Sequence, residues 1–210
     1  YNHLDYLISK NEVNAVIGSL VSRSGIKYGI NRPNPFCNDP LNYVSKTDLT
    51  KRYDFENTFV KAARRVLGGD SVAYKNQGHL TNGVQTAGNF FALKGDLIAS
   101  ISDIIHLEIE KYRRVFENSN EGFIKCWPKS YKLEGWLVSM KSGGKLASHM
   151  HDTGWITGSV YINVPAKAGT DSGNLVVAIT DAKDATGGIQ SQSIDVTTGS
   201  LCLFPSSLLH

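Results

Sequence analysis

The chain has 210 residues, of which 41% are hydrophobic and 20% are charged, which is typical of a globular protein with a substantial core. Its 22 basic and 19 acidic residues are spread along the chain, so we expect no nucleic-acid-binding face and no basic membrane patch. Three cysteines without CxxC spacing argue against a disulfide framework and favour a cytoplasmic setting. We also expect no membrane-spanning helix, because no apolar run approaches the required length of about 20 residues.

The first half of the sequence carries most of the helical signal. Apolar residues recur at roughly helical spacing over 2–21 and over 55–67, and the second of these segments stops at a Gly-Gly pair, a common helix end. The longest helix is predicted over 94–117, where apolar residues form a stripe along one side. The segment 29–40 is rich in Asn, Pro and Gly and is predicted to be a loop.

After residue 121 the pattern changes to short apolar runs separated by turn residues. The predicted strands are Phe123–Trp127, Leu133–Met140, Trp155–Val164, Leu175–Ile179, Ser191–Val196 and Ser200–Phe204. Short strands at regular spacing favour a sandwich or barrel, and the lack of strand–helix alternation argues against Rossmann and TIM folds. The predicted fold class is therefore α+β, with helix-rich residues 1–120 packed against a strand-rich part, residues 121–210.

The sharpest local feature is the sequence His149-Met150-His151-Asp152. On a strand, residues two apart point to the same face, so His149 and His151 can converge on one point. A third histidine, His210, follows the last apolar run, and a jelly roll can bring such a distant residue to the same end of the sheet. Imidazole binds Fe, Zn, Cu and Ni, so the ligand type alone does not select the metal. The alternative that these are surface or hydrogen-bonded histidines stays open.

Several motifs that occur in the same order resemble the family of 2-oxoglutarate- and Fe(II)-dependent oxygenases. These motifs are Gly135-Trp136, Gly143-Gly144, His149-x-His151, Gly154-Trp155-Ile-Thr-Gly-Ser-Val-Tyr161 and Gly199-Ser-Leu-Cys-Leu-Phe-Pro-Ser-Ser-Leu-Leu-His210. Within that superfamily the sequence most resembles a branch found in marine phages and in bacterial proteins with tetratricopeptide repeats. The segments 80–91 and 127–131 also resemble this branch, so the similarity covers about residues 75–210.

The resemblance implies a double-stranded β-helix, a jelly roll of the cupin type, that holds one Fe(II), with His149 as the first ligand and His210 as the distal one. It implies that 2-oxoglutarate chelates the metal and is converted to succinate and CO2 while a substrate, here an unknown small molecule or protein, is hydroxylated. Tyr161 lies at a strand position that relatives sometimes use to contact 2-oxoglutarate. The resemblance to the repeat-containing branch also suggests an upstream repeat domain.

Two departures from the superfamily pattern leave alternatives open. The usual carboxylate two positions after the first histidine is replaced by His151, so either three histidines hold the metal or Asp152 supplies the carboxylate, and strand alternation favours His151. The basic residue that grips 2-oxoglutarate in relatives follows the distal histidine, whereas this sequence stops at His210, so we expect a jelly roll truncated at its C-terminal end. A cupin-like three-histidine enzyme without 2-oxoglutarate and a non-catalytic jelly-roll binding module are the competing interpretations.

Other side chains are weaker candidates for the site. Trp136 and Trp155 are more often core residues than substrate contacts, and Asn82 and Gln85 lie in a predicted loop that could border a pocket. Nucleotide-binding and hydrolase motifs are missing from the sequence: it contains no P-loop, no GxGxxG after a strand and no GxSxG elbow.

Overall fold

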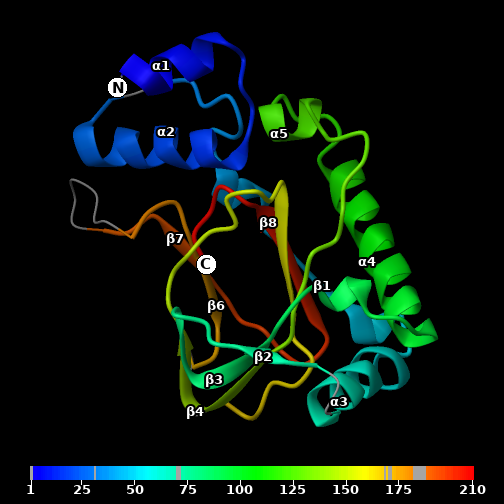
Figure 1. The fold of residues 1–210 in the computed structure, drawn as a ribbon. Helices are drawn as coiled ribbons and strands as arrows, with labels where there is room; N and C mark the ends of the chain where they lie inside the picture. The colour runs from blue at the N-terminus through cyan, green and yellow to red at the C-terminus, as the bar shows by residue number, and fades with distance from the viewer. Residues whose placement is uncertain (1, 31, 70–71, 168, 170–171, 182–187) are drawn as a thin grey trace. The chain divides into compact units, whose positions relative to one another are not determined.

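The computed structural model describes residues 2–30, 32–69, 72–167, 169, 172–181 and 188–210 (Figure 1). Its helical elements are α1 (Asn2–Ser9), α2 (Ala15–Tyr28), η1 (Pro40–Tyr43), η2 (Leu49–Lys51), η3 (Glu56–Val60), α3 (Lys61–Gly68), η4 (Phe90–Ala92), α4 (Asp96–Val115) and α5 (Gly122–Lys125). Its strands are β1 (Ser45–Asp48), β2 (Tyr74–Lys75), β3 (Leu80–Thr86), β4 (Val138–Leu146), β5 (Ile156–Val160), β6 (Leu175–Ala178), β7 (Ser191–Ile194) and β8 (Ser200–Pro205). None of the helices in this part of the chain is long and apolar enough to cross a membrane.

The helices predicted for the N-terminal half are present, but the first segment is divided into two helices. Asn11 adopts a left-handed φ of 57° between α1 and α2, and Asn14 then caps α2, its side chain accepting a 2.9 Å hydrogen bond from the Ile17 amide. Gly29 ends α2 at a φ of 66°. The second predicted segment, 55–67, becomes a π-helical turn, η3, followed by α3. The long helix α4 lies within the predicted range 94–117.

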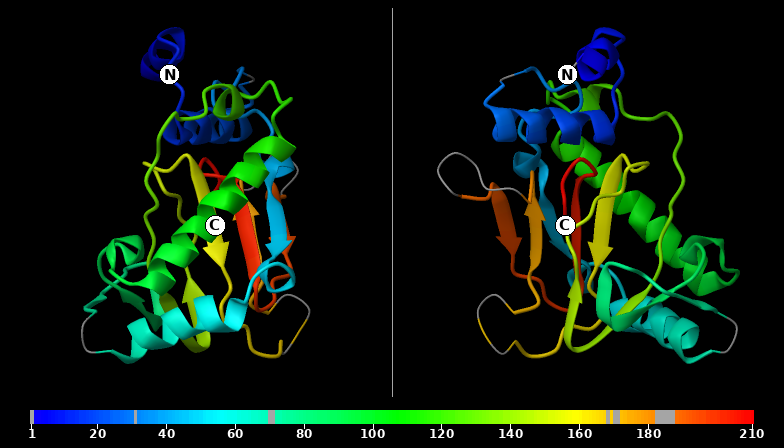
Figure 2. Two further views of the ribbon diagram at one scale, coloured as in Figure 1. Left: turned by 90° about the vertical axis from the view of Figure 1, so that its right-hand side faces the viewer. Right: turned by 60° about the vertical axis from the view of Figure 1, so that its left-hand side comes forward.

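The strands form three sheets in the orders β1-β8-β5, β2-β3-β4 and β6-β7. The pairs β2–β3, β3–β4, β5–β8 and β6–β7 are antiparallel. Figure 2 shows β8 (red) beside β5 (yellow), and β6 beside β7 in orange. Helices together with antiparallel sheets confirm the α+β class.

Three local predictions are wrong. The run Phe123–Trp127 is not a strand, because residues 122–125 form the helical turn α5, in which the Phe123 amide donates to the Phe36 carbonyl at 2.8 Å. Periodicity cannot separate helix from strand in so short an apolar run. The sequence Ser142-Gly143-Gly144, whose composition predicts a turn, is a bulge inside β4, where Gly143 has a φ of 72° and the register against β3 shifts. The segment 80–86, predicted as loop, is strand β3.

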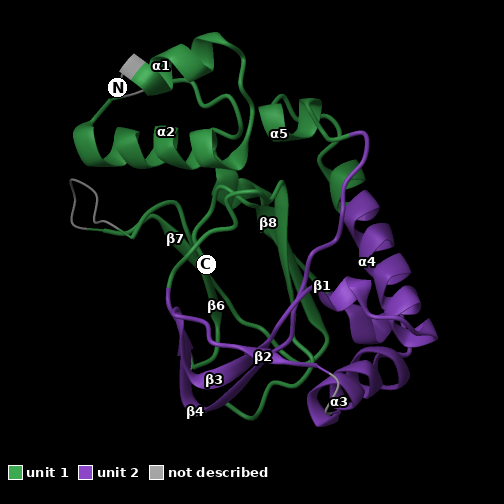
Figure 3. Cartoon of the chain, in the orientation of Figure 1, with its two compact units in different colours: residues 1–47, 112–128, 148–210 green, residues 48–111, 129–147 purple. Residues whose placement is uncertain are grey.

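The chain divides into two compact units (Figure 3). Unit 1 comprises residues 1–47, 112–128 and 148–210, and unit 2 comprises residues 48–111 and 129–147. Unit 1 therefore contains the β6-β7 sheet and most of the β1-β8-β5 sheet, whereas unit 2 contains the β2-β3-β4 sheet and most of α4.

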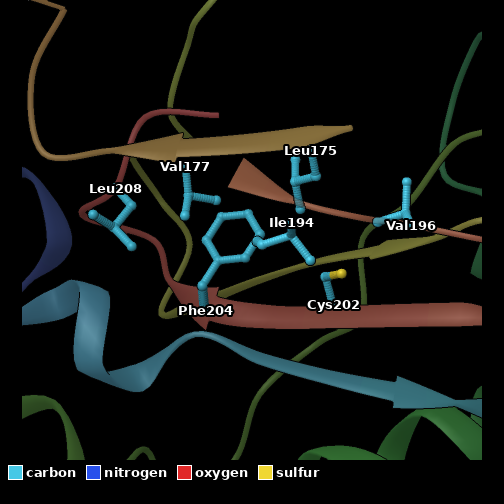
Figure 4. Packing of buried hydrophobic residues seen from close by; sticks show 7 residues of the cluster. All are labelled: Leu175, Val177, Ile194, Val196, Cys202, Phe204 and Leu208. Carbon is cyan, nitrogen blue, oxygen red and sulfur yellow. The ribbon is translucent and has the colours of Figure 1, made fainter. Parts of the chain in front are cut away.

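The core of unit 1 lies between strands β6, β7 and β8. Its buried members are Leu175, Val177, Ile194, Val196, Cys202, Phe204 and Leu208. Phe204 of β8 reaches between Val177 of β6 and Ile194 of β7 (Figure 4). Apolar side chains at every second position of these strands explain this cluster, because alternate residues of a strand share one face.

Unit 2 contains a buried carboxylate, Glu108 of α4, whose side chain is only 3% exposed. It accepts hydrogen bonds of 2.6 Å from the Tyr53 hydroxyl and 2.6 Å from Lys111 Nζ, and Arg52 lies 3.3 Å away. Burial by itself would raise the pKa of Glu108, but the hydrogen bonds from Lys111 and Tyr53 and the two neighbouring positive charges lower it. The carboxylate is therefore ionised and satisfied, and it links α4 to the segment that holds Tyr53.

We expect Glu108→Gln to lower the free energy of unfolding by about 1–2 kcal/mol, because the neutral amide weakens charge-assisted hydrogen bonds in a buried position. Urea unfolding at neutral pH measures this change. Glu117→Gln, at an exposed position near the end of the same helix, is the matched control and should change stability by less than about 0.5 kcal/mol. Equal effects of the two substitutions would contradict a stabilising role for the Glu108 network.

Candidate metal centre

Backbone pairing brings two of the predicted site histidines together. The His149 amide donates to the His210 carbonyl at 3.1 Å, and the His210 amide donates to the His149 carbonyl at 2.9 Å. On the other side of this segment, Leu209 and Ala178 exchange two backbone hydrogen bonds of 2.8 Å each. The last residues of the chain thus lie between the His149 segment and β6, an arrangement typical of an antiparallel sheet.

The third histidine completes a compact group. Ring centroids are 4.4 Å apart for His149 and His210, 5.0 Å for His151 and His210, and 5.3 Å for His149 and His151. One nitrogen from each ring lies within 4.8 Å of one from each of the others. Nitrogens bound to one ion at about 2.1 Å are roughly 3 Å apart, so modest side-chain rotations would bring all three onto a metal. The geometry and the donor type both fit a transition metal.

Burial favours the neutral form of His151 and His210, which is the form that binds a metal. The pKa of His210 falls to about 3, first because burial disfavours the charged ring and then because His149 and His151 would repel it. The pKa of His151 is also lowered, mainly by burial and by His149, while Asp152 opposes the change. The Nδ1 atom of His210 is buried and forms no hydrogen bond within the described residues. A buried imidazole nitrogen without such a partner fits a residue that binds an ion.

The lowered pKa of His210 predicts how the metal-free protein responds to pH. In the unfolded chain the histidine gains a proton near its ordinary pKa of about 6.5, whereas in the folded chain it stays neutral until about pH 3. The unfolded state therefore binds more protons between these values, and stability falls as the pH drops below about 6.5. One such histidine accounts for a loss of about 1 kcal/mol between pH 6.5 and 5.5. Urea unfolding with a chelator present, at these two pH values, measures the loss.

The control for this pH dependence is the His210→Phe variant, in which the slope between pH 6.5 and 5.5 should become smaller. An unchanged slope in this variant would contradict the assignment of the pH dependence to His210.

The remaining predicted residues occupy different positions. Asp152 is exposed on the turn after the histidine motif and is not part of the converging group. Tyr161 packs against the unit 1 core, and burial raises the pKa of its hydroxyl. Trp155 is fixed structurally, because its Nε1 donates to the Phe123 carbonyl at 2.8 Å and its ring packs edge-on against Phe36.

The weaker candidates Trp136, Asn82 and Gln85 all lie in unit 2. Asn82 lies in β3 opposite the β4 bulge, with a φ of 50°, and Gln85 is buried. In unit 1, sequence reasoning missed Phe204 as a neighbour of the site, although its ring centroid is 5.3 Å from that of His210. The only signal was its place in an apolar strand that ends shortly before the last histidine.

Comparison with known proteins yields one match. Residues 134–210 match the model of the family described as "Putative 2OG-Fe(II) oxygenase". The matched range includes all three histidines of the converging group. The family implies Fe(II) and 2-oxoglutarate as cofactors, and the three histidines could hold the metal. No curated protein and no solved structure matches the chain.

Proposed function

Starting from the family match over residues 134–210, we propose that this protein is an Fe(II)- and 2-oxoglutarate-dependent dioxygenase in which His149, His151 and His210 bind the metal. One observation carries the proposal. Ligand nitrogens from two segments about sixty positions apart in the sequence converge within 4.8 Å inside the matched range. Surface histidines have no reason to converge in this way, whereas a metal site requires it.

We further propose that residues 121–210 form the core of a double-stranded β-helix. The order of antiparallel neighbours supports this fold: the His149 segment pairs with the His210 segment, which contacts β6 through Leu209 and Ala178, and β6 pairs with β7. A second row pairs β5 with β8. Sheets in which neighbouring strands are far apart in the sequence, rather than joined as sequential hairpins, are typical of a jelly roll.

Fe(II), when bound with 2-oxoglutarate, supplies oxidative decarboxylation to succinate and CO2 coupled to hydroxylation of a substrate. The protein's own contribution is to present three imidazole nitrogens that converge on one point. His151 is the proposed third ligand rather than Asp152, because its ring belongs to the converging group and the Asp152 side chain is exposed. Phe204 packs beside His210, with the two ring centroids 5.3 Å apart.

Tyr161 is the proposed contact for 2-oxoglutarate. Its ring packs against the cluster formed by β6, β7 and β8, the same cluster that contains Phe204. Since burial raises its pKa, the hydroxyl stays protonated and can donate a hydrogen bond to a carboxylate. Replacement by phenylalanine should therefore weaken 2-oxoglutarate binding without changing metal affinity.

The proposal is tested by following 2-oxoglutarate and succinate with the purified chain under air. We expect succinate to form only when Fe(II) is present, and His149→Ala to stop its formation. His79→Ala is the matched control, because His79 does not belong to the converging group, and it should keep the activity. Metal binding without succinate formation would instead favour a cupin-like three-histidine enzyme. Failure to bind any metal, with the fold intact, would favour a non-catalytic binding module.

A further inference from the structure

The three histidines are not held in the same way. His149 and His210 are fixed to each other by a reciprocal pair of backbone hydrogen bonds. His151 lies two residues beyond this pair, at the start of a turn in which the Gly154 amide donates to the His151 carbonyl at 3.0 Å. The position of the His151 ring relative to the other two therefore depends on what holds this turn.

The turn contacts Ser206, which lies four positions before His210. Ser206 is fully buried, with 0% of its surface exposed. The Ser206 amide donates to the carbonyl of Trp155, the residue after Gly154, at 3.2 Å. The Ser206 hydroxyl lies 2.8 Å from the hydroxyl of Thr157, which is also buried. The segment that ends at one metal ligand thus also supports the turn that begins at another.

Gly154 is the point of closest approach in this contact. A Cβ atom at this position would lie 2.6 Å from Ser206 Oγ, 3.2 Å from Ser206 Cβ and 3.2 Å from the His151 carbonyl oxygen. Such distances are shorter than carbon–oxygen and carbon–carbon van der Waals contacts, so any larger residue would push the turn away from Ser206. The glycine is therefore required for space.

We propose that Gly154 and Ser206 are positioning residues for the metal centre: their contact sets the distance of His151 from the His149–His210 pair. The inference rests on the proposed function, because it assumes that the three histidines bind one metal. The new claim is that metal binding also depends on the contact between Gly154 and Ser206, although neither residue is a proposed metal ligand. Changes to residues that orient metal ligands typically alter metal affinity 10- to 100-fold.

The test measures Co(II) binding, because its visible absorption bands report both the affinity and the geometry of the ligands. Gly154→Ala should weaken Co(II) binding by about 10- to 100-fold and alter the bands. Ser206→Gly removes both Ser206 atoms that crowd the new methyl group, so adding Gly154→Ala to the Ser206→Gly chain should cost much less affinity than adding it to the unaltered chain. Gly158→Ala on β5 is the matched control, because its Cβ would meet the movable end of the Leu203 side chain.

The outcomes separate this inference from the proposed function. If the unaltered chain does not bind Co(II), the three-histidine centre itself is wrong, and the inference falls with it. If the unaltered chain binds Co(II) and Gly154→Ala keeps its affinity and bands, only the inference is overturned. A Gly154→Ala substitution that weakens Co(II) binding as much in the Ser206→Gly chain as in the unaltered chain would also overturn it.

A second variant keeps the test decisive if Gly154→Ala does not fold. Thr157→Val preserves the shape of the side chain but removes the hydroxyl that holds Ser206. We expect it to weaken Co(II) binding several-fold and to shift the bands. Unchanged Co(II) affinity and bands in this variant would contradict the role of Ser206.

Discussion

Replacing His210 with phenylalanine is expected to abolish metal binding while leaving the metal-free fold at least as stable as before. The substitution removes one of the three histidines that we propose as ligands, so the loss of affinity should exceed the roughly 100-fold that changes around a metal site produce. It also removes a buried nitrogen that has no hydrogen-bond partner within the described residues, which should raise the free energy of unfolding by about 1 kcal/mol. Thermal unfolding with and without Fe(II) under anaerobic conditions measures both effects.

In the unaltered protein, Fe(II) should raise the unfolding temperature, because a ligand that binds only the folded state stabilises it. In the His210→Phe variant this increase should vanish. His3→Ala, at an exposed histidine of α1, is the matched control and should keep the increase. An Fe(II)-induced increase that survives in the His210→Phe variant would contradict the assignment of His210 as a ligand.

The second large effect is expected from Gly122→Ala. A Cβ atom at this first position of α5 would overlap the Pro35 carbonyl oxygen. It would also lie 3.4 Å from the Phe36 carbonyl oxygen. Because the obstacle is backbone rather than a side chain, the loop and α5 must separate, at a cost of about 3 kcal/mol. Moving α5 away from the loop would also affect Trp155, because the Phe123 carbonyl of α5 accepts a hydrogen bond from Trp155 Nε1. Chemical unfolding gives the loss of stability.

Gly68→Ala is the control for this substitution, because a Cβ at Gly68, the last residue of α3, meets no atom within 4 Å. It should be neutral or slightly stabilising, by up to about 1 kcal/mol. A Gly122→Ala variant as stable as Gly68→Ala would show that the close approach of α5 to Pro35 is not essential.

Much of the fold follows from local patterns in the sequence. The stripe of apolar residues that runs through Ile98, Ile101 and Ile105 predicts α4, because a helix buries every third or fourth residue. The short apolar runs Leu175–Ile179 and Ser200–Phe204 likewise predict strands, which the structure shows as β6 and β8. Where burial and periodicity agree, the prediction is confirmed.

Elsewhere, contacts between distant segments decide the structure. Phe123 and Ile124 are as apolar as a strand requires, yet they form a helical turn because Gly122 packs against a loop more than eighty positions earlier. The glycines at 143 and 144 predict a turn, but in the structure they lie in a bulge of β4, which pairs with β3 on both sides of them. No local signal distinguishes these cases, because the deciding partner is remote in the sequence.

The candidate site shows the same division. His149 and His151 are predicted to converge from strand alternation alone, and their ring centroids lie 5.3 Å apart. His210 joins them only through the order of motifs in the resemblance, since nothing local links it to residue 149. Ser206 was not predicted to matter, because a serine after a proline resembles any turn residue.

The most direct test of a three-histidine Fe(II) centre that uses 2-oxoglutarate is an anaerobic absorption titration. Fe(II) is added first to the purified chain, and 2-oxoglutarate is then added in steps. If the cosubstrate binds the metal held by His149, His151 and His210, a visible charge-transfer band should grow and saturate at one Fe(II) per chain, and it should be missing in His210→Phe. If no visible band appears and Fe(II) does not change the unfolding temperature, the proposed three-histidine Fe(II) centre is contradicted.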